Sequence, residues 1–141
     1  MIHILNQKQF MDPLKTYLQN NRPFLGICLG LHALFEESEE APGLKGLGIL
    51  KGCARRFRVE RSVPHIGWNG IKAKQPSILF NDIRGDEKFY FVHSFYVDPV
   101  ETSVILTTTE YGIEFVSGIQ TGSIMATQFH PEKSGSTGLT F

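Results

Sequence analysis

The feature that most constrains the fold is an apolar run, residues 23–28, that leads directly into a glycine-flanked cysteine. A short apolar run after a turn signal is typical of a buried strand. Beyond the cysteine, Leu31, Leu34 and Phe35 recur at helical spacing to about residue 37. A strand that turns tightly into a helix predicts an α/β fold with parallel strands.

A second helix is predicted before this strand. Asp12 and Pro13 suit an N-cap and a first helical position, and Leu14, Tyr17 and Leu18 follow at i, i+3 and i+4. The rest of the chain is rich in strand patterns. Expected strands cover residues 56–59, 88–98, 103–109, 114–119 and 124–129. We therefore expect one α/β domain over residues 1–141, with a strand-rich second half and no linker.

Composition narrows the functional class. The chain has 141 residues with 14 basic and 14 acidic side chains, so bulk charge attracts no nucleic acid. Its two cysteines, Cys28 and Cys53, are too few for a disulfide framework and lack zinc-ligand spacing. Reduced thiols in the cytoplasm are expected, with no metal. No apolar run approaches the roughly 20 residues needed to span a bilayer.

The cysteine lies in the pattern G-x-C-x-G, formed by Gly26, Cys28 and Gly30, which is that of a nucleophile elbow. Such a turn needs glycine flanks and holds its nucleophile at a strained backbone angle. The N-terminus of the following helix is expected to lower the thiol pKa, and the Leu29 N–H would face an oxyanion. The alternative is a small buried cysteine after a core strand. Cys53 lacks this context and is interpreted as structural.

A nucleophilic thiol needs a base, and the base needs an orienting group. Of the five histidines, His130 is the strongest candidate because it follows a predicted strand. Glu132 lies two positions further on, so its carboxylate can fix the imidazole tautomer across Pro131. The candidate catalytic residues are therefore Cys28, His130 and Glu132.

The cysteine elbow and the His-Pro-Glu motif together resemble those of class I, or triad-type, glutamine amidotransferases. The segments that narrow the resemblance are residues 23–31, 35–40, 63–69, 89–95 and 128–135. They are similar to the glutaminase subunit or domain of imidazole glycerol phosphate synthases, which act in histidine biosynthesis. The resemblance implies a flavodoxin-like fold and a cytoplasmic protein, or a plastid one in a plant-like source.

The resemblance also implies a reaction. Cys28 attacks the carboxamide of L-glutamine, His130 protonates the departing ammonia, and Glu132 orients His130. Water then hydrolyses the γ-glutamyl thioester, and no cofactor is needed. The ammonia passes to a cyclase partner, either a separate chain or a fused domain, which makes imidazole glycerol phosphate and the aminoimidazole ribotide AICAR.

Further roles follow from the resemblance. Glu40 would bind the α-ammonium of glutamine, and the backbone at Ser94 and Phe95 its α-carboxylate. Trp68 and Lys133 would lie at the partner interface. Each has a plainer alternative: Glu40 belongs to an acidic run that suits a solvated helix end, and tryptophan is commonly a core residue. His65 and His93 are interpreted as structural.

Two departures from the family pattern matter. The family has a glutamine that helps hold the substrate side chain where this chain has His32, which adds a titrating group beside the nucleophile. The family also begins with a further strand and helix and a Pro-Gly-x-Gly oxyanion loop, which nothing in residues 1–27 matches. Beside the glutaminase we therefore keep a catalytically impaired fragment or paralogue that acts as an interaction subunit. A different cysteine hydrolase on the same scaffold is less favoured.

Overall fold

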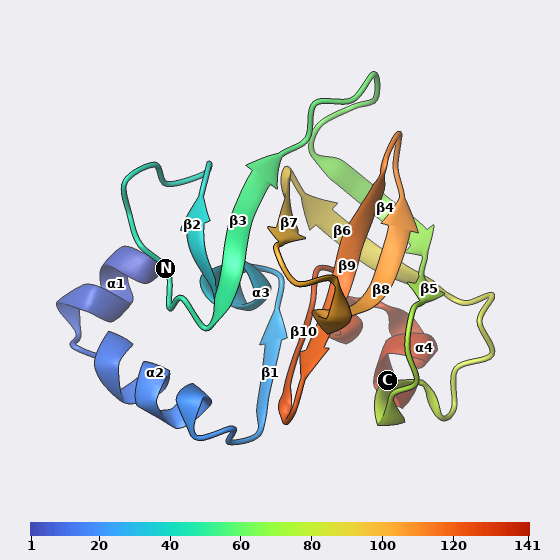
Figure 1. The fold of residues 1–141 in the computed structure, drawn as a ribbon. Coiled ribbons are helices and arrows are strands. Elements are labelled where there is room, and N and C mark those ends of the chain that lie inside the picture. Colours follow the sequence, from blue (N-terminus) through green and yellow to red (C-terminus); the bar gives the residue numbers. More distant parts are fainter.

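A computed structural model describes residues 1–141 and is built around an eight-stranded mixed sheet (Figure 1). Its strands are β1 (Phe24–Ile27), β2 (Phe35–Ser38), β3 (Leu50–Arg56), β5 (Lys72–Ala73), β7 (Phe95–Pro99), β8 (Ile105–Glu110), β9 (Glu114–Thr121) and β10 (Ile124–Thr127). The order is β1-β10-β9-β7-β3-β2, with β8 also paired to β9, and β5 to β8. A second sheet pairs β4 (His65–Gly70) with β6 (Lys88–His93).

Helices are few and short. They are α1 (Ile2–Gln7), α2 (Met11–Gln19), α3 (Leu29–Ala33) and α4 (Gly135–Thr140), with 3-10 turns η1 (Ile78–Phe80), η2 (Thr102–Val104) and η3 (Pro131–Lys133). The pairs β1–β10 and β2–β3 are parallel, and the other strand pairs are antiparallel. Helix α3 connects β1 to β2 and contacts both, so the two ends of the strand order meet at this helix (Figure 1). The expected α/β class with a strand-rich second half is confirmed.

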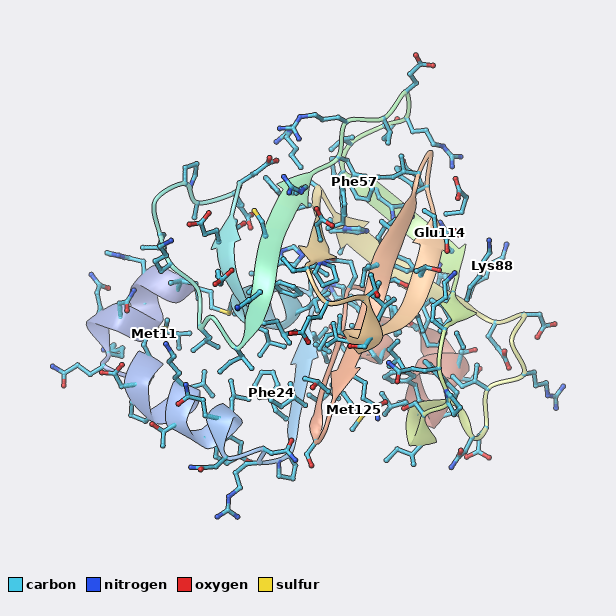
Figure 2. The ribbon with its side chains drawn as sticks, viewed as in Figure 1. Met11, Phe24, Phe57, Lys88, Glu114 and Met125 are labelled. Atoms are coloured by element: carbon cyan, nitrogen blue, oxygen red, sulfur yellow. The ribbon has the colours of Figure 1, made fainter.

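Two hydrophobic clusters form the core. The larger one joins α2, α3 and the main sheet, and includes the fully buried Leu18, Leu34 and Phe35. Met11 on α2 and Phe24 on β1 pack against it (Figure 2). The smaller cluster is aromatic and contains Phe57, Phe89, Phe91, Phe115 and Phe129. Burial of one such side chain contributes about 1.5–3 kcal/mol to the free energy of unfolding.

Several predicted elements were wrong in their bounds. The helix predicted to continue to residue 37 stops at Ala33, because Phe35 pairs with Leu50 and starts strand β2. The single strand predicted over residues 88–98 is two strands, β6 and β7, which belong to different sheets and separate at Ser94. The apolar alternation continues unchanged across Ser94, so the sequence pattern gives no sign of the break. The break is visible only in the pairing of each strand with its partner.

Smaller differences in the element bounds are also found. The weak strand predicted at residues 56–59 lies earlier, at Leu50–Arg56, where pairing with β2 and β7 compensates for the low strand propensity of Gly52. Helix α2 begins at Met11, so Asp12 lies in its first turn and is not the N-cap. Helices α1 and α4 and strand β4 were not predicted.

The second sheet buries a histidine pair. His65 Nδ1 lies 3.0 Å from His93 Nε2, and His93 Nδ1 donates to the Phe95 carbonyl at 2.7 Å. His65 also stacks on the Tyr111 ring, with 3.9 Å between ring centroids. Burial lowers the pKa of His65 to about 4, with a contribution from the charge of Arg61, and lowers that of His93 to about 3. Both imidazoles are therefore neutral at physiological pH, in keeping with their structural interpretation.

This pair predicts a loss of stability in acid. Unfolded imidazoles bind a proton near pH 6.5, whereas His65 and His93 in the folded chain bind one only near pH 4 and 3. The free energy of unfolding should be highest above about pH 6.5 and fall by up to about 1.4 kcal/mol per histidine per pH unit below it. Urea unfolding between about pH 7 and pH 4 measures this slope. His93→Gln should reduce the slope and the exposed His3→Gln should not; equal slopes in all three proteins would contradict the assignment.

Candidate active site

Cys28 occupies the tight turn between β1 and α3. Its backbone has φ 50° and ψ −99°, a left-handed conformation that is costly for a residue other than glycine. The strain is held by hydrogen bonds: Cys28 N–H donates to the Thr127 carbonyl at 2.8 Å, and the Cys28 carbonyl accepts from Leu31 N–H at 3.0 Å. The side chain is half-buried at the carboxyl end of β1. This is the backbone geometry of a nucleophile elbow.

The two glycines that flank this turn are not equivalent. A Cβ on Gly26 would lie 2.9 Å from the Gly30 carbonyl carbon and 3.0 Å from Phe24 Cε1, so only glycine fits there. A Cβ on Gly30 would meet nothing within 4 Å. The expectation that both positions must be glycine is therefore wrong for Gly30, because the chain passes close to Gly26 alone.

This difference predicts opposite effects for two matched substitutions. Gly26→Ala should lower the free energy of unfolding by about 1–3 kcal/mol, because the added methyl group overlaps the Gly30 backbone. Gly30→Ala, within α3 and with open space around it, should leave stability unchanged or raise it by up to about 1 kcal/mol. Urea unfolding of both variants measures the difference. Equal losses would show that Gly30 is also sterically required.

His130 follows β10, which is the parallel neighbour of the strand that leads into Cys28. Ile27 pairs with Thr127, so Cys28 and His130 both follow the carboxyl ends of adjacent strands. His130 Nδ1 lies 2.6 Å from Glu132 Oε1; a carboxylate only accepts, so Nδ1 carries the proton. His130 Nε2 is buried and has no hydrogen-bond partner. In the neutral imidazole the lone pair is therefore on Nε2, the atom that can accept a proton.

Glu132 is half-exposed on η3, and its carboxylate accepts the hydrogen bond from this imidazole. Partial burial raises the pKa of its carboxyl, but the hydrogen bond from His130 and other favourable contacts outweigh burial and leave the pKa below its usual value. The carboxylate is therefore ionised at neutral pH and can hold the imidazole orientation. The His130 N–H donates to the Tyr90 carbonyl at 2.9 Å, which anchors the segment to β6.

The environment of the thiol differs from the sequence-based expectation. Burial is the largest influence and raises the pKa of Cys28, and the charges of Glu40 and Glu132 act in the same direction. The Leu29 N–H and the Gln128 amide lower it, but they do not compensate for burial. The expected lowered pKa is therefore wrong for this structure. The resting thiol is neutral, and a base must remove its proton when it reacts.

Gln128 is a site residue that the sequence did not single out. It is fully buried, and its Nε2 lies 3.6 Å from Cys28 Sγ. Its Oε1 lies 2.8 Å from Nε2 of His32, a buried residue of α3. The only sequence signal was its place next to Phe129 in the His-Pro-Glu segment, and a buried amide has no distinguishing pattern.

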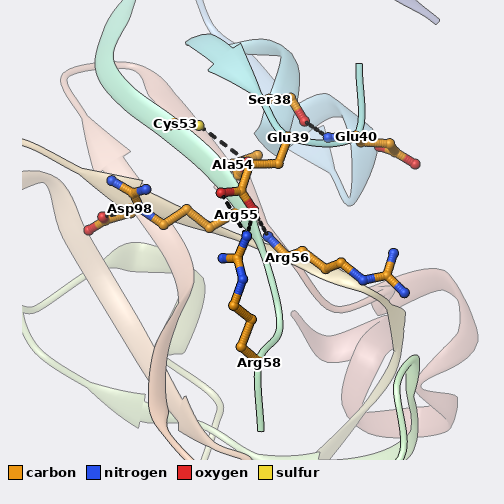
Figure 3. Close-up of polar contacts among 9 residues, drawn as sticks. All are labelled: Ser38, Glu39, Glu40, Cys53, Ala54, Arg55, Arg56, Arg58 and Asp98. Atoms are coloured by element: carbon orange, nitrogen blue, oxygen red, sulfur yellow. Dashed lines mark hydrogen bonds and ion pairs between the residues drawn. The ribbon is translucent and has the colours of Figure 1, made fainter. Parts of the chain in front are cut away.

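The acidic run after α3 does not form a helix end. Glu36 and Glu37 lie on β2, where Glu36 accepts from Gly52 N–H at 3.2 Å and Glu37 pairs with Lys45. Glu39 accepts from the Arg56 N–H at 2.7 Å and contacts Arg58 (Figure 3). The carboxylate of Glu40 makes no hydrogen bond or ion pair, and in Figure 3 its side chain points away from this network.

The predicted oxyanion residue and two of the predicted substrate residues share one cavity. Leu29, His32 and Glu40 line a cavity of about 330 Å³ beside the elbow. Phe95 instead lines a separate pocket of about 510 Å³. Ser94 lies at the β6–β7 break, and its carbonyl accepts from Phe57 N–H at 3.0 Å. The structure thus groups Leu29, His32 and Glu40, and leaves the Ser94–Phe95 backbone apart from them.

Trp68 and Lys133 lie on the surface near this site. Trp68 is 55% exposed on β4. Its ring packs edge-on against that of Tyr90, with 6.0 Å between ring centroids. Ile66, two residues earlier on the same face, is 59% exposed. Lys133 is exposed on η3, directly after Glu132. The reading of Trp68 as a core residue is therefore wrong.

The sequence profile of the class-I glutamine amidotransferases matches residues 6–140. This chain belongs to that family. Within that family, it is 53% identical over 117 residues to "Imidazole glycerol phosphate synthase subunit HisH" of Methanocaldococcus jannaschii, covering 83% of this chain and 59% of that protein. It is 44% identical over 141 residues to "Imidazole glycerol phosphate synthase hisHF, chloroplastic" of Arabidopsis thaliana, covering 97% of this chain and 24% of that one.

Solved amidotransferase structures share the fold. A "glutamine amidotransferase" crystal structure superposes with a TM-score of 0.72 at 18% identity, over 98% of this chain and 68% of that one. A glutamine amidotransferase from Thermotoga maritima superposes with a TM-score of 0.64 at 21% identity, over 93% and 50%. The class I amidotransferase fold predicted from the motifs is confirmed.

The chain spans between 58% and 64% of the length of three curated relatives it matches. No helix in the structure is both long enough and apolar enough to cross a membrane. No group of three or more His, Cys, Asp and Glu side chains is arranged to hold a metal ion.

Proposed function

We propose that this chain is the glutaminase component of an imidazole glycerol phosphate synthase. It hydrolyses L-glutamine to glutamate and ammonia through a thioester on Cys28, and delivers the ammonia to a cyclase. The observation that carries the proposal is a thiol held at a strained elbow after β1, together with a histidine after the adjacent strand β10 whose Nε2 has no partner and whose Nδ1 is bound to Glu132. The curated relatives named as subunits of that synthase support the pathway.

The chemistry follows from the protonation states. The neutral thiol of Cys28 loses its proton to His130 Nε2, and the sulfur attacks the carboxamide carbon of glutamine. The imidazolium, stabilised by Glu132, then protonates the leaving nitrogen, which departs as ammonia while the C–S thioester forms. In the second half, His130 takes a proton from water, whose oxygen attacks the thioester carbon and releases glutamate and the thiol.

Leu29 and Glu40 have roles in the same proposal. The Leu29 N–H lies in the first turn of α3, where amides have no intrahelical acceptor, and it would donate to the oxyanion. The unpaired carboxylate of Glu40 would bind the α-ammonium of glutamine in the 330 Å³ cavity. His32 lines the same cavity and would contact the substrate side chain, whereas the Ser94–Phe95 backbone, expected to bind the α-carboxylate, does not line it.

The cyclase would dock on the exposed face of β4. Trp68 and Ile66 form an apolar pair there, and Lys133 lies on the turn that follows His130. His130 N–H binds the Tyr90 carbonyl and Tyr90 N–H binds Ser134 Oγ, so β6 connects this face to the catalytic turn. Two free cysteines support a reducing compartment, either the cytoplasm or a plastid.

Trp68 offers a direct test of this interface, because it is the sole tryptophan of the chain. When a tryptophan-free cyclase variant binds, Trp68 should lose contact with water, and its emission should shift to shorter wavelength. Trp68→Ala should weaken binding by about 2 kcal/mol or more, as expected of an aromatic hot spot, whereas Tyr17→Ala on α2 should have no effect. An emission maximum that stays unchanged at saturating cyclase would place the interface elsewhere.

The proposed activity is tested by ammonia release from glutamine, with and without the cyclase. We expect a γ-glutamyl adduct on Cys28, detected by mass spectrometry of acid-quenched reactions, and a faster release with the cyclase present. No adduct and no ammonia in the presence of a bound cyclase would contradict the glutaminase. That result would favour the alternative, an interaction subunit without catalysis.

A further inference from the structure

We propose that Gln128 is a positioning residue that presents an N–H donor to the sulfur of Cys28, and that His32 fixes the direction of its amide. The inference starts from a chain of three side chains: the buried His32 and Gln128 and the half-buried Cys28. His32 Nε2 lies 2.8 Å from Gln128 Oε1, and Gln128 Nε2 lies 3.6 Å from Cys28 Sγ. The catalytic consequence rests on the proposed glutaminase function, whereas the thiol chemistry tested below does not.

Gln128 is held rigidly at the end of β10. The residue is fully buried, and its backbone N–H donates to the Ser117 carbonyl at 2.9 Å. On the neighbouring parallel strand, Cys28 N–H donates to the Thr127 carbonyl at 2.8 Å. The amide and the sulfur are therefore carried on two backbone segments that are bound to each other, and their separation is set by the sheet.

The direction of the amide follows from the protonation of His32. Burial lowers the pKa of His32, so its imidazole carries a single proton at neutral pH. A proton on Nδ1 would be buried without an acceptor, because His32 Nδ1 has no hydrogen-bond partner. The proton therefore lies on Nε2, which donates to Gln128 Oε1. The amide NH₂ then faces the sulfur, where it can donate to the thiolate as that forms.

The donor matters because the sulfur is otherwise in an unfavourable place for negative charge. Burial and the carboxylates of Glu40 and Glu132 disfavour the thiolate. The Leu29 N–H and the Gln128 amide are the groups that favour it, and Gln128 is the only side chain among them. A hydrogen bond to an ionised group is about twice as strong as one between neutral groups, so the contact strengthens as the thiol loses its proton.

The test is the pH dependence of Cys28 alkylation by iodoacetamide, resolved from Cys53 by peptide mass spectrometry. Gln128→Met keeps the length and volume of the side chain but removes the donor. It should raise the pKa of Cys28 by about one unit and slow alkylation about tenfold below that pKa. Gln128→Leu should do the same. His32→Leu, which frees the amide to turn, should slow alkylation several-fold, and His32→Gln, which still donates to Oε1, should restore it.

Gln120→Leu is the matched control, because this β9 glutamine also has a buried amide oxygen but no contact with the sulfur. Its alkylation profile should be unchanged. A wild-type thiol pKa in folded Gln128→Met overturns the proposal, and wild-type behaviour of His32→Leu overturns the part played by His32. If neither Gln128 variant folds, the His32→Leu and His32→Gln pair decides.

The glutaminase assay separates this proposal from the function on which it rests. In an active protein, Gln128→Met should lower kcat and leave KM near the wild-type value, because the amide contacts the sulfur and does not line the substrate cavity. If the wild-type chain with bound cyclase releases no ammonia, the proposed function fails, yet the alkylation profiles still decide the role of Gln128.

Discussion

Cys28→Ala is expected to abolish glutamine hydrolysis, with a loss of at least about 10⁴-fold in kcat. The substitution removes the only atom at the elbow that can form a thioester, and it leaves His130 and Glu132 in place. The methyl side chain of alanine fits the same backbone turn, so the variant should fold. Steady-state ammonia release measures the loss, and mass spectrometry should detect no γ-glutamyl adduct.

Cys53→Ala is the matched control for this experiment. Cys53 lies on β3, and its thiol donates to the Ala54 carbonyl at 3.3 Å, away from the elbow. Its removal should change kcat by less than about twofold, within the range of a substitution that touches no reacting group. Residual activity in Cys28→Ala close to that of Cys53→Ala would show that Cys28 is not the nucleophile, and the site would have to be sought elsewhere.

Phe91→Ala is expected to cost about 3–5 kcal/mol of the free energy of unfolding. Phe91 is fully buried in the aromatic cluster, where it stacks on His65 at 4.8 Å and contacts Phe129 at 5.7 Å between ring centroids. The loss leaves a cavity that the surrounding strands cannot close, since they are fixed by their hydrogen-bond ladders. Domains of this size have a total stability of about 5–15 kcal/mol, so the variant should unfold at a much lower urea concentration.

Phe10→Ala supplies the comparison. Phe10 is 57% exposed just before α2, and its truncation should change stability by less than about 0.5 kcal/mol. Phe91→Ala should also reduce activity, because Phe129 packs against Phe91 and directly precedes His130. A loss below about 1 kcal/mol in Phe91→Ala would show that the aromatic cluster is loosely packed.

The local elements around the elbow were predictable because they depend on neighbouring residues. The strand at Phe24–Ile27, the turn at Cys28 and the amphipathic face of α2 follow from apolar spacing and from glycine placement. The link between His130 and Glu132 was equally local, since the two side chains are two residues apart and meet across one proline. Short-range patterns of this kind need no knowledge of the rest of the fold.

The long-range contacts could not be predicted in this way. Gln128 lies 100 residues from Cys28 and gains its role only because β1 and β10 pair in parallel register. The break at Ser94 and the strand at Phe35–Ser38 likewise depend on the partner strands. Burial of Cys28 raises its pKa, whereas the position at a helix N-terminus had predicted the reverse.

The sequence by itself determined the class of the chain, the elbow and the contact between His130 and Glu132, because motif residues and their spacing are local properties. Only the tertiary structure decided which glycine is required, which glutamate of the acidic run is left unpaired, and which amide faces the sulfur. Those properties depend on which atoms from distant parts of the sequence contact each group. Strand pairing and burial determine these contacts, and they cannot be read from the order of residues along the chain.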